Sequence, residues 1–227
     1  MPAEHAMWSA FTYYAALAFE AFFGIFGVRL YEEPKYDVIG RLPDGVEIRR
    51  YGPRIAAGVE APGAGQKASG EAFGLLFAYI AGANRAQGAT SGPVAERVAE
   101  RVAMTVPVEV RGKERVAMTV PVQARQAGGA MEMLFYLPAK FTVKTAPVPT
   151  DARVRIVSIP GATIATLRYS GSGSDFAARQ SQLAAALKDS PWRMVSAPYV
   201  LSYDAPFTLP FLRRNEAAVA VEPAVQK

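Results

Sequence analysis

The alternation of apolar and polar positions divides the chain near residue 30. Residues 7–30 are almost wholly apolar, and Glu20 and Arg29 are the only charged residues among them. A helix of this length would extend about 36 Å, enough to cross a hydrocarbon core of about 30 Å with some tilt. The pattern predicts an N-terminal membrane-spanning helix, and it leaves open an amphipathic helix lying on a membrane or packed on the rest of the protein. No Lys or Arg precedes the apolar stretch, which disfavours a cleavable signal peptide.

Three residues within this segment indicate a neighbour in the membrane. A carboxyl such as that of Glu20 is costly in mid-span unless it is protonated or paired inside a helix bundle. Gly24 and Gly27 would let a second helix approach closely. We therefore expect a membrane-protein partner as well as membrane lipid. Basic residues follow the segment and none precede it, so the positive-inside rule places the C-terminal domain in the cytoplasm.

After a predicted linker at residues 31–45, the chain twice shows the order strand, turn, strand, helix. In the first unit, residues 46–51 and 54–60 alternate like strands about Gly52-Pro53, and residues 69–81 have helical spacing. The second unit has strands at 154–159 and 163–169 and a helix at about 176–188. The sequences VEIRRYGPRIAAGV and VRIVSIPGATIATL align in this order. Further strands are expected at 131–137, 198–204 and 217–221.

These elements predict an α+β fold made of duplicated β-β-α-β units, with two helices packed on a curved antiparallel sheet. The predicted divisions are a membrane helix at 1–30, a linker at 31–45, a folded domain at 46–222 and a tail at 223–227. An internal repeat, RVAMTVPV, occurs at 101–108 and again at 115–122. We expect the two copies to be strands joined by a turn at 111–113.

Composition excludes several kinds of chemistry. The 227 residues include no cysteine and one histidine, His5, which lies before the apolar segment. A Ser-His-Asp triad, thiolate metal sites and a histidine cluster are therefore excluded from the folded domain. The net charge of +5 is spread without a dense basic run, so nucleic acid is not an expected partner. We predict a binding protein and not an enzyme.

Soft apolar side chains are the best candidates for ligand contact. Phe73 and Phe77 lie one turn apart on the predicted helix, beside a stripe with enough bulk for the core. Met104 and Met118 occupy the same place in the two copies of the repeat. Such residues suit an irregular hydrophobic ligand, and core packing explains them equally well. The glycine-rich GSGSD before the second helix lacks phosphate-loop spacing, and we interpret it as a helix cap.

Several motifs in this order resemble the SOUL/haem-binding protein family. They are VEIRRYGP, AYIAGAN at the end of the first helix, VAMTVPV twice, Pro149-Thr-Asp, and PFTLPFLRRNEAAV at 206–219. The resemblance covers about residues 31–222. It implies a twisted antiparallel sheet or open barrel flanked by two helices, and it implies non-covalent binding of haem or another tetrapyrrole.

The resemblance also implies a set of binding residues. The first helix would contribute Phe73 and Phe77, with Met104 and Met118 as further candidates. Some family members carry a haem-ligating histidine where this sequence has Arg50, so we expect Arg50 to pair with a propionate instead. The predicted function is a single-pass, membrane-anchored haem or tetrapyrrole carrier without catalysis. The alternative is an accessory subunit of a membrane protein complex, docked through the N-terminal helix, whose domain serves as scaffold whether or not it still binds haem.

Overall fold

The structure is a computed structural model that describes residues 32–63, 65–87, 102, 107–112, 130–171, 175–204 and 208–224. The predicted membrane segment at 7–30 lies outside the described residues, as do Met104 and Met118. Among the residues that are described, no helix is long and apolar enough to span a bilayer.

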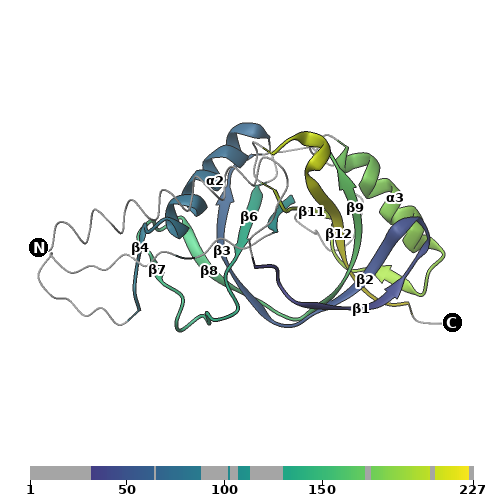
Figure 1. The fold of residues 1–227 in the computed structure, drawn as a ribbon, viewed down its shortest axis with the longest axis horizontal. Helices are drawn as coiled ribbons and strands as arrows, with labels where there is room; N and C mark the ends of the chain where they lie inside the picture. The colour runs from purple at the N-terminus through teal and green to yellow at the C-terminus, as the bar shows by residue number, and fades with distance from the viewer. Residues whose placement is uncertain are drawn as a thin grey trace, which may run out of the picture.

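The fold is α+β, as the sequence predicts: a curled antiparallel sheet forms a half-barrel, and two helices cover its outer side (Figure 1). The helices are α2 (Gln66–Ile80) and α3 (Phe176–Lys188), with short 3-10 turns η1 (Pro43–Gly45) and η3 (Pro210–Leu212). The strands are β1 (Tyr36–Arg41), β2 (Val46–Tyr51), β3 (Arg54–Ala61), β4 (Asn84–Arg85), β5 (Val108–Gly112), β6 (Met131–Tyr136), β7 (Val148–Pro149), β8 (Val154–Ile159), β9 (Ala162–Ser170), β10 (Trp192–Met194), β11 (Tyr199–Ser202) and β12 (Arg214–Pro223).

The strand order in the sheet is symmetric with respect to the two sequence units. It runs β1-β2-β9-β12-β11-β5-β6-β3-β8, with β10 paired to β12. Each half of the sheet therefore holds the first strand of one unit and the later strands of the other. The strand β2 pairs with β9, and β3 pairs with β8, so the two units exchange their first strands.

Two short crossings join the halves of the sheet, one at Gly52-Pro53 and one at Pro160-Gly161. The sequence predicts these positions as turns, but β2 and β3 do not form a hairpin with each other. The crossings lie against one another, because a Cβ on Gly161 would stand 3.0 Å from the carbonyl oxygen of Tyr51. A side chain at Gly161 would require one of the two backbones to shift by a few tenths of an ångström.

Each helix covers one half of the sheet and closes a separate core. Leu76 and Tyr79 of α2 pack against β3, β6 and β8, and Leu183 and Leu187 of α3 pack against β2, β9 and β12. Alternate residues of these strands point to the other, concave side. The helix α2 stops before Gly82, whose φ of 121° is the left-handed conformation that glycine supplies at helix ends.

Two sequence predictions about local structure are wrong. Residues 31–45, predicted as a linker, contain β1, which pairs with β2 along the edge of the sheet. The turn predicted at 111–113 is also misplaced, since Arg111 and Gly112 belong to β5 and pair with Glu132 and Met131 of β6. Both errors have one cause. A polar or glycine-containing segment becomes a strand when a partner strand lies beside it, and local alternation does not reveal that partner.

Candidate functional site

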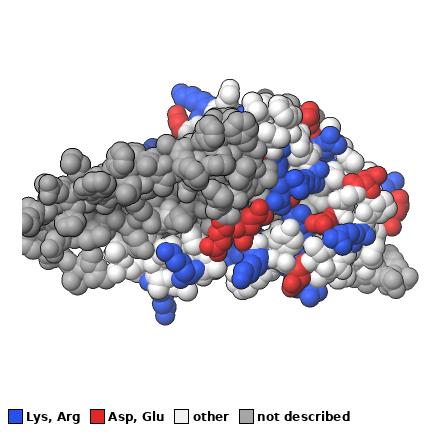
Figure 2. Space-filling model, viewed as in Figure 1, with Lys and Arg blue, Asp and Glu red and all other residues white. Residues whose placement is uncertain are grey.

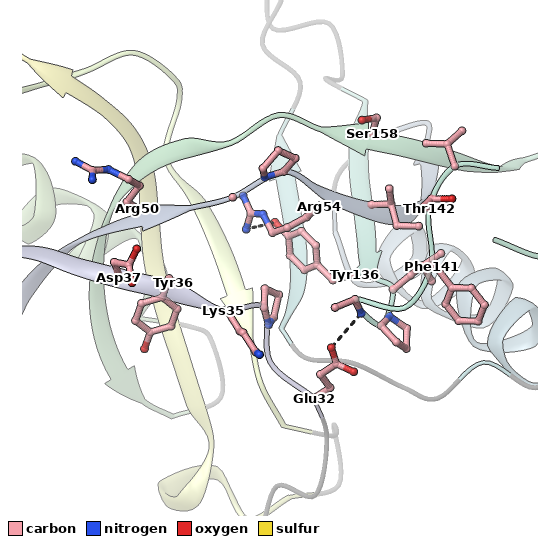
Figure 3. Close-up of a pocket in the computed structure, with 18 residues that line it drawn as sticks. Glu32, Lys35, Tyr36, Asp37, Arg50, Arg54, Tyr136, Phe141, Thr142 and Ser158 are labelled. Atoms are coloured by element: carbon pink, nitrogen blue, oxygen red, sulfur yellow. Dashed lines mark hydrogen bonds between the residues drawn. The ribbon is translucent and has the colours of Figure 1, made fainter. Parts of the chain in front are cut away.

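A cavity of about 700 Å³ lies beside the β2–β3 crossing, where the two halves of the sheet meet (Figure 3). One wall is the segment from Glu32 to Asp37, which leads into β1, and another is the β2–β3 crossing. The third is formed by the end of β6 and the loop that follows it. Its volume falls within the range of about 300–1,000 Å³ that is usual for small-molecule sites. Apolar wall residues include Pro34, Pro53, Ile55, Leu137, Phe141 and Val143.

The segment before β1 is held to both halves of the sheet. On one side, the carboxylate of Glu32 accepts a hydrogen bond of 3.0 Å from the backbone N–H of Ala139. On the other side, Arg214 at the start of β12 donates to Glu33 at 3.1 Å. This segment therefore closes the cavity across the open side of the half-barrel.

Arg54 and Tyr136 occupy the middle of the cavity in Figure 3. The Arg54 guanidinium carbon lies 4.3 Å from the centre of the Tyr51 ring and 4.9 Å from that of Tyr136. Tyr136 in turn donates a hydrogen bond to the fully buried carboxylate of Glu109. Burial, together with the charge of Glu109, raises the pKa of Tyr136 well above its ordinary value, so the phenol stays protonated.

A second polar cluster lies on the concave side of the other half. Glu216, fully buried on β12, accepts hydrogen bonds from Arg49 at 2.7 Å, from Arg214 at 2.8 Å and from the Tyr203 hydroxyl at 2.8 Å. Burial alone would raise the pKa of Glu216, but the two guanidinium charges and these hydrogen bonds outweigh it and hold the pKa below its usual value. The cluster fixes β2 to β12 and supports the segment before β1 through Glu33.

The residues predicted from sequence are not brought together at one place. Arg50 lines the cavity, but it is exposed at one edge, directly across from Asp37 of β1. Phe73 and Phe77 stack on each other with ring centroids 6.1 Å apart, away from the cavity lining. The Phe73 ring also meets the core residue Phe135 edge-on at 5.4 Å, while Phe77 is 39% exposed. Met104 and Met118 remain predictions.

The comparison with protein families decides the identity of this architecture. The family profile described as SOUL heme-binding protein matches residues 31–220, most of the chain. The chain belongs to the SOUL haem-binding protein family. Among curated proteins, none matches the sequence.

Solved structures resemble this SOUL-family protein in fold alone. The EcmrR C-terminal domain is 10% identical, with a TM-score of 0.56 over 83% of this chain and 99% of that one. An uncharacterized conserved protein from Listeria innocua is 13% identical, with a TM-score of 0.52 over 79% and 93%. A hydrolase from the same organism is 11% identical, with a TM-score of 0.54 over 80% and 93%. At such identities, no activity is carried over from these neighbours.

The charge distribution of the SOUL-family domain is mixed. Figure 2 shows basic and acidic side chains interspersed over the described part of one face. Within the described ranges, no three acidic or histidine side chains gather as a metal site. The cavity is mixed in charge as well, since Lys35, Arg50 and Arg54 line it together with Glu32 and Asp37.

Sequence reasoning did not find Arg54, Tyr136 or Glu109. The aligned repeats carried one signal, because Arg54 follows the first crossing where the second repeat has Ala162. Glu109 gave no comparable signal, since its contact with Tyr136 joins strands far apart in sequence.

Proposed function

We propose that this SOUL-family protein is a membrane-anchored, non-catalytic carrier of haem or a related tetrapyrrole, which it holds in the cavity beside the β2–β3 crossing. The family match over residues 31–220 carries this proposal, and the cavity supplies a place of suitable size. Apolar walls would contact the macrocycle, and basic residues would face its acid side chains.

The lining residues fit a macrocycle held by its faces and edges. None of them is histidine, and Tyr136, with its pKa well above the ordinary value, stays protonated. The cavity therefore offers apolar contact, guanidinium groups and the protonated phenol of Tyr136.

The cavity is favoured over the surface of α2 predicted from sequence. Phe73 is partly used by the core through Phe135, which leaves Phe77 as the exposed ring on that stripe. One exposed ring gives less contact area than a walled cavity.

Haemin titration of the full-length protein in lipid nanodiscs separates these two surfaces. Ser158 is an exposed residue at the cavity wall, so Ser158→Trp should block the cavity with little effect on the core. We expect saturable binding with a Soret band for the unchanged protein, a loss of roughly tenfold or more for Ser158→Trp, and little change for Phe77→Ala. The reverse pattern would place the macrocycle on α2, and no binding to any of the three would refute the carrier.

Membrane anchoring rests on the apolar stretch at residues 7–30. We expect the full-length protein to fractionate with membranes and to resist salt and alkaline washes, with the domain on the cytoplasmic side. Because the chain has no cysteine, Lys188→Cys on the exposed side of α3 gives a single thiol. An impermeant maleimide should label it in inverted vesicles and not in intact cells. Recovery of the protein from the soluble fraction would contradict the anchor.

The second candidate function is an accessory subunit of a membrane complex. Glu20, Gly24 and Gly27 favour it, because a paired carboxyl and two small residues suit a helix–helix contact. Native purification in mild detergent distinguishes the two functions. A stoichiometric membrane protein without bound tetrapyrrole would support the subunit, and a Soret band without a partner would support the carrier.

A further inference from the structure

Arg54 is clamped in the middle of the cavity. It is the first residue of β3, directly after the Gly52-Pro53 crossing, and its guanidinium lies over the rings of Tyr51 and Tyr136. Its Nη1 also donates to the Tyr136 hydroxyl at 3.4 Å. Contacts of a guanidinium with two aromatic faces restrict its orientation and offset part of its desolvation.

The guanidinium of Arg54 has donors that nothing in the described part of the chain uses. The Nε–H group is buried without a hydrogen-bond acceptor, and Tyr136 is the one hydrogen-bond partner of this side chain among the described residues. Arg54 forms no ion pair there, whereas Arg49 and Arg214 are each bound to Glu216. An arginine has five N–H donors, and leaving a buried one unpaired is costly.

The fold does not require an arginine at this position. Alignment of the two repeats places Ala162 opposite Arg54, and the sheet register agrees, since Tyr51 pairs with Ala162 and Arg54 pairs with Ile159. The second crossing is therefore built with alanine where the first has arginine. The crossing itself therefore does not need the cation, and unlike Arg49, Arg54 lines the cavity and has no carboxylate partner among the described residues.

The other cations of the cavity, Lys35 and Arg50, are exposed, whereas Arg54 is partly buried. Arg50 lies at the edge with Asp37 directly opposite, and Glu32 is engaged by the N–H of Ala139. Glu109 lies behind Tyr136, which takes its hydrogen bond. The N–H groups of a guanidinium have the spacing that matches the two oxygens of a carboxylate.

We propose that Arg54 is the carboxylate anchor of the cavity, so that the protein selects ligands bearing a free acid side chain. This rests on the proposed tetrapyrrole-binding function and names the chemical group that the site reads. A carboxylate ligand gives the Arg54 guanidinium the counter-charge that the described part of the chain does not supply. An esterified or decarboxylated macrocycle fills the same apolar walls and leaves the guanidinium without a counter-charge.

The test compares haemin with haemin dimethyl ester, which lacks both negative charges. In nanodiscs, the full-length protein should bind haemin at least roughly tenfold more tightly than the diester. Arg54→Gln should lose that preference by weakening haemin binding and leaving diester binding unchanged. Arg155→Gln is the matched control, because Arg155 on the adjacent β8 is exposed and paired with Glu60, and it should keep the preference.

Each outcome decides one of the two proposals. An unchanged acid-to-ester preference in Arg54→Gln overturns the anchor, and a collapse of that preference in Arg50→Gln alone assigns the role to the edge residue. Failure of the unchanged protein to bind either compound refutes the carrier function itself. If Arg54→Gln does not fold, Arg54→Lys keeps the charge and loses the planar fork, and it should retain only part of the preference.

Discussion

Replacing Glu216 with glutamine should remove a large part of the protein's free energy of unfolding. Glu216 is fully buried, and its carboxylate is the shared counter-charge for the guanidinium groups of Arg49 and Arg214. Removing one partner of a buried ion pair leaves charge uncompensated and typically costs about 3–5 kcal/mol. Since whole domains are stable by only about 5–15 kcal/mol, we expect the thermal midpoint to fall on the order of 10 °C.

The same cluster predicts the direction of acid sensitivity. Glu216 has a pKa below its ordinary value in the folded protein, so it binds protons more weakly there than in the unfolded chain. Its contribution to stability is therefore fully present above the unfolded value of about 4.3 and is lost as the pH falls from there through the folded pKa. Urea unfolding between pH 7 and pH 3 should show this loss in the unchanged protein and a flatter profile in Glu216→Gln.

Glu222 provides a matched control on the same strand. It also pairs with an arginine, Arg193, but both side chains are more than half exposed. Exposed ion pairs contribute about 0–1 kcal/mol, so Glu222→Gln should leave the thermal midpoint nearly unchanged. Equal effects of the two substitutions would show that the cluster at Glu216 does not stabilise the fold.

Leu76→Ala should cost about 2–5 kcal/mol, because Leu76 is fully buried between α2 and the sheet and its removal leaves a cavity. Phe77→Ala, at the next position of α2, should cost less than about 1 kcal/mol, because its ring is 39% exposed. Chemical denaturation of both variants measures the difference in the free energy of unfolding.

A larger loss for Phe77→Ala than for Leu76→Ala would mean that the ring is covered by a part of the chain outside the described residues. Phe73→Ala should fall between the two, since its ring meets Phe135 in the core and stacks on Phe77.

Local sequence pattern was sufficient for elements that are amphipathic in themselves. The strand at 46–51 alternates Val46 and Ile48 toward α3 with Glu47 and Arg49 toward the concave side, and it was predicted with its observed bounds. The second-unit strand at 154–159 was predicted equally well. In these segments each residue's environment follows from its position in the strand, so the alternation carries the information.

The sequence was insufficient wherever a distant partner decides the structure. Residues 36–41 form β1 because β2 lies beside them, although their own pattern suggests a linker. The exchange of first strands between the repeats joins β2 to β9 and β3 to β8, pairings that no local signal specifies. The cavity and Arg54 were missed for the same reason, since the walls come from segments that meet only after this exchange. Arg50 was chosen from resemblance and proved to lie at the edge.

The way the halves of the sheet are joined also limits how a ligand can enter and leave. The β11–β5 ladder and the two crossings connect the halves, so swinging them apart to open the cavity would have to break that ladder. Two walls lie outside the strand ladders, the loop after β6 and the stretch before β1, and the latter is held by the side chains of Glu32 on Ala139 and Glu33 on Arg214. We infer that this stretch moves aside when a ligand enters or leaves the cavity. Because it follows directly on the proposed membrane anchor, tension or docking at the bilayer would act on the stretch itself.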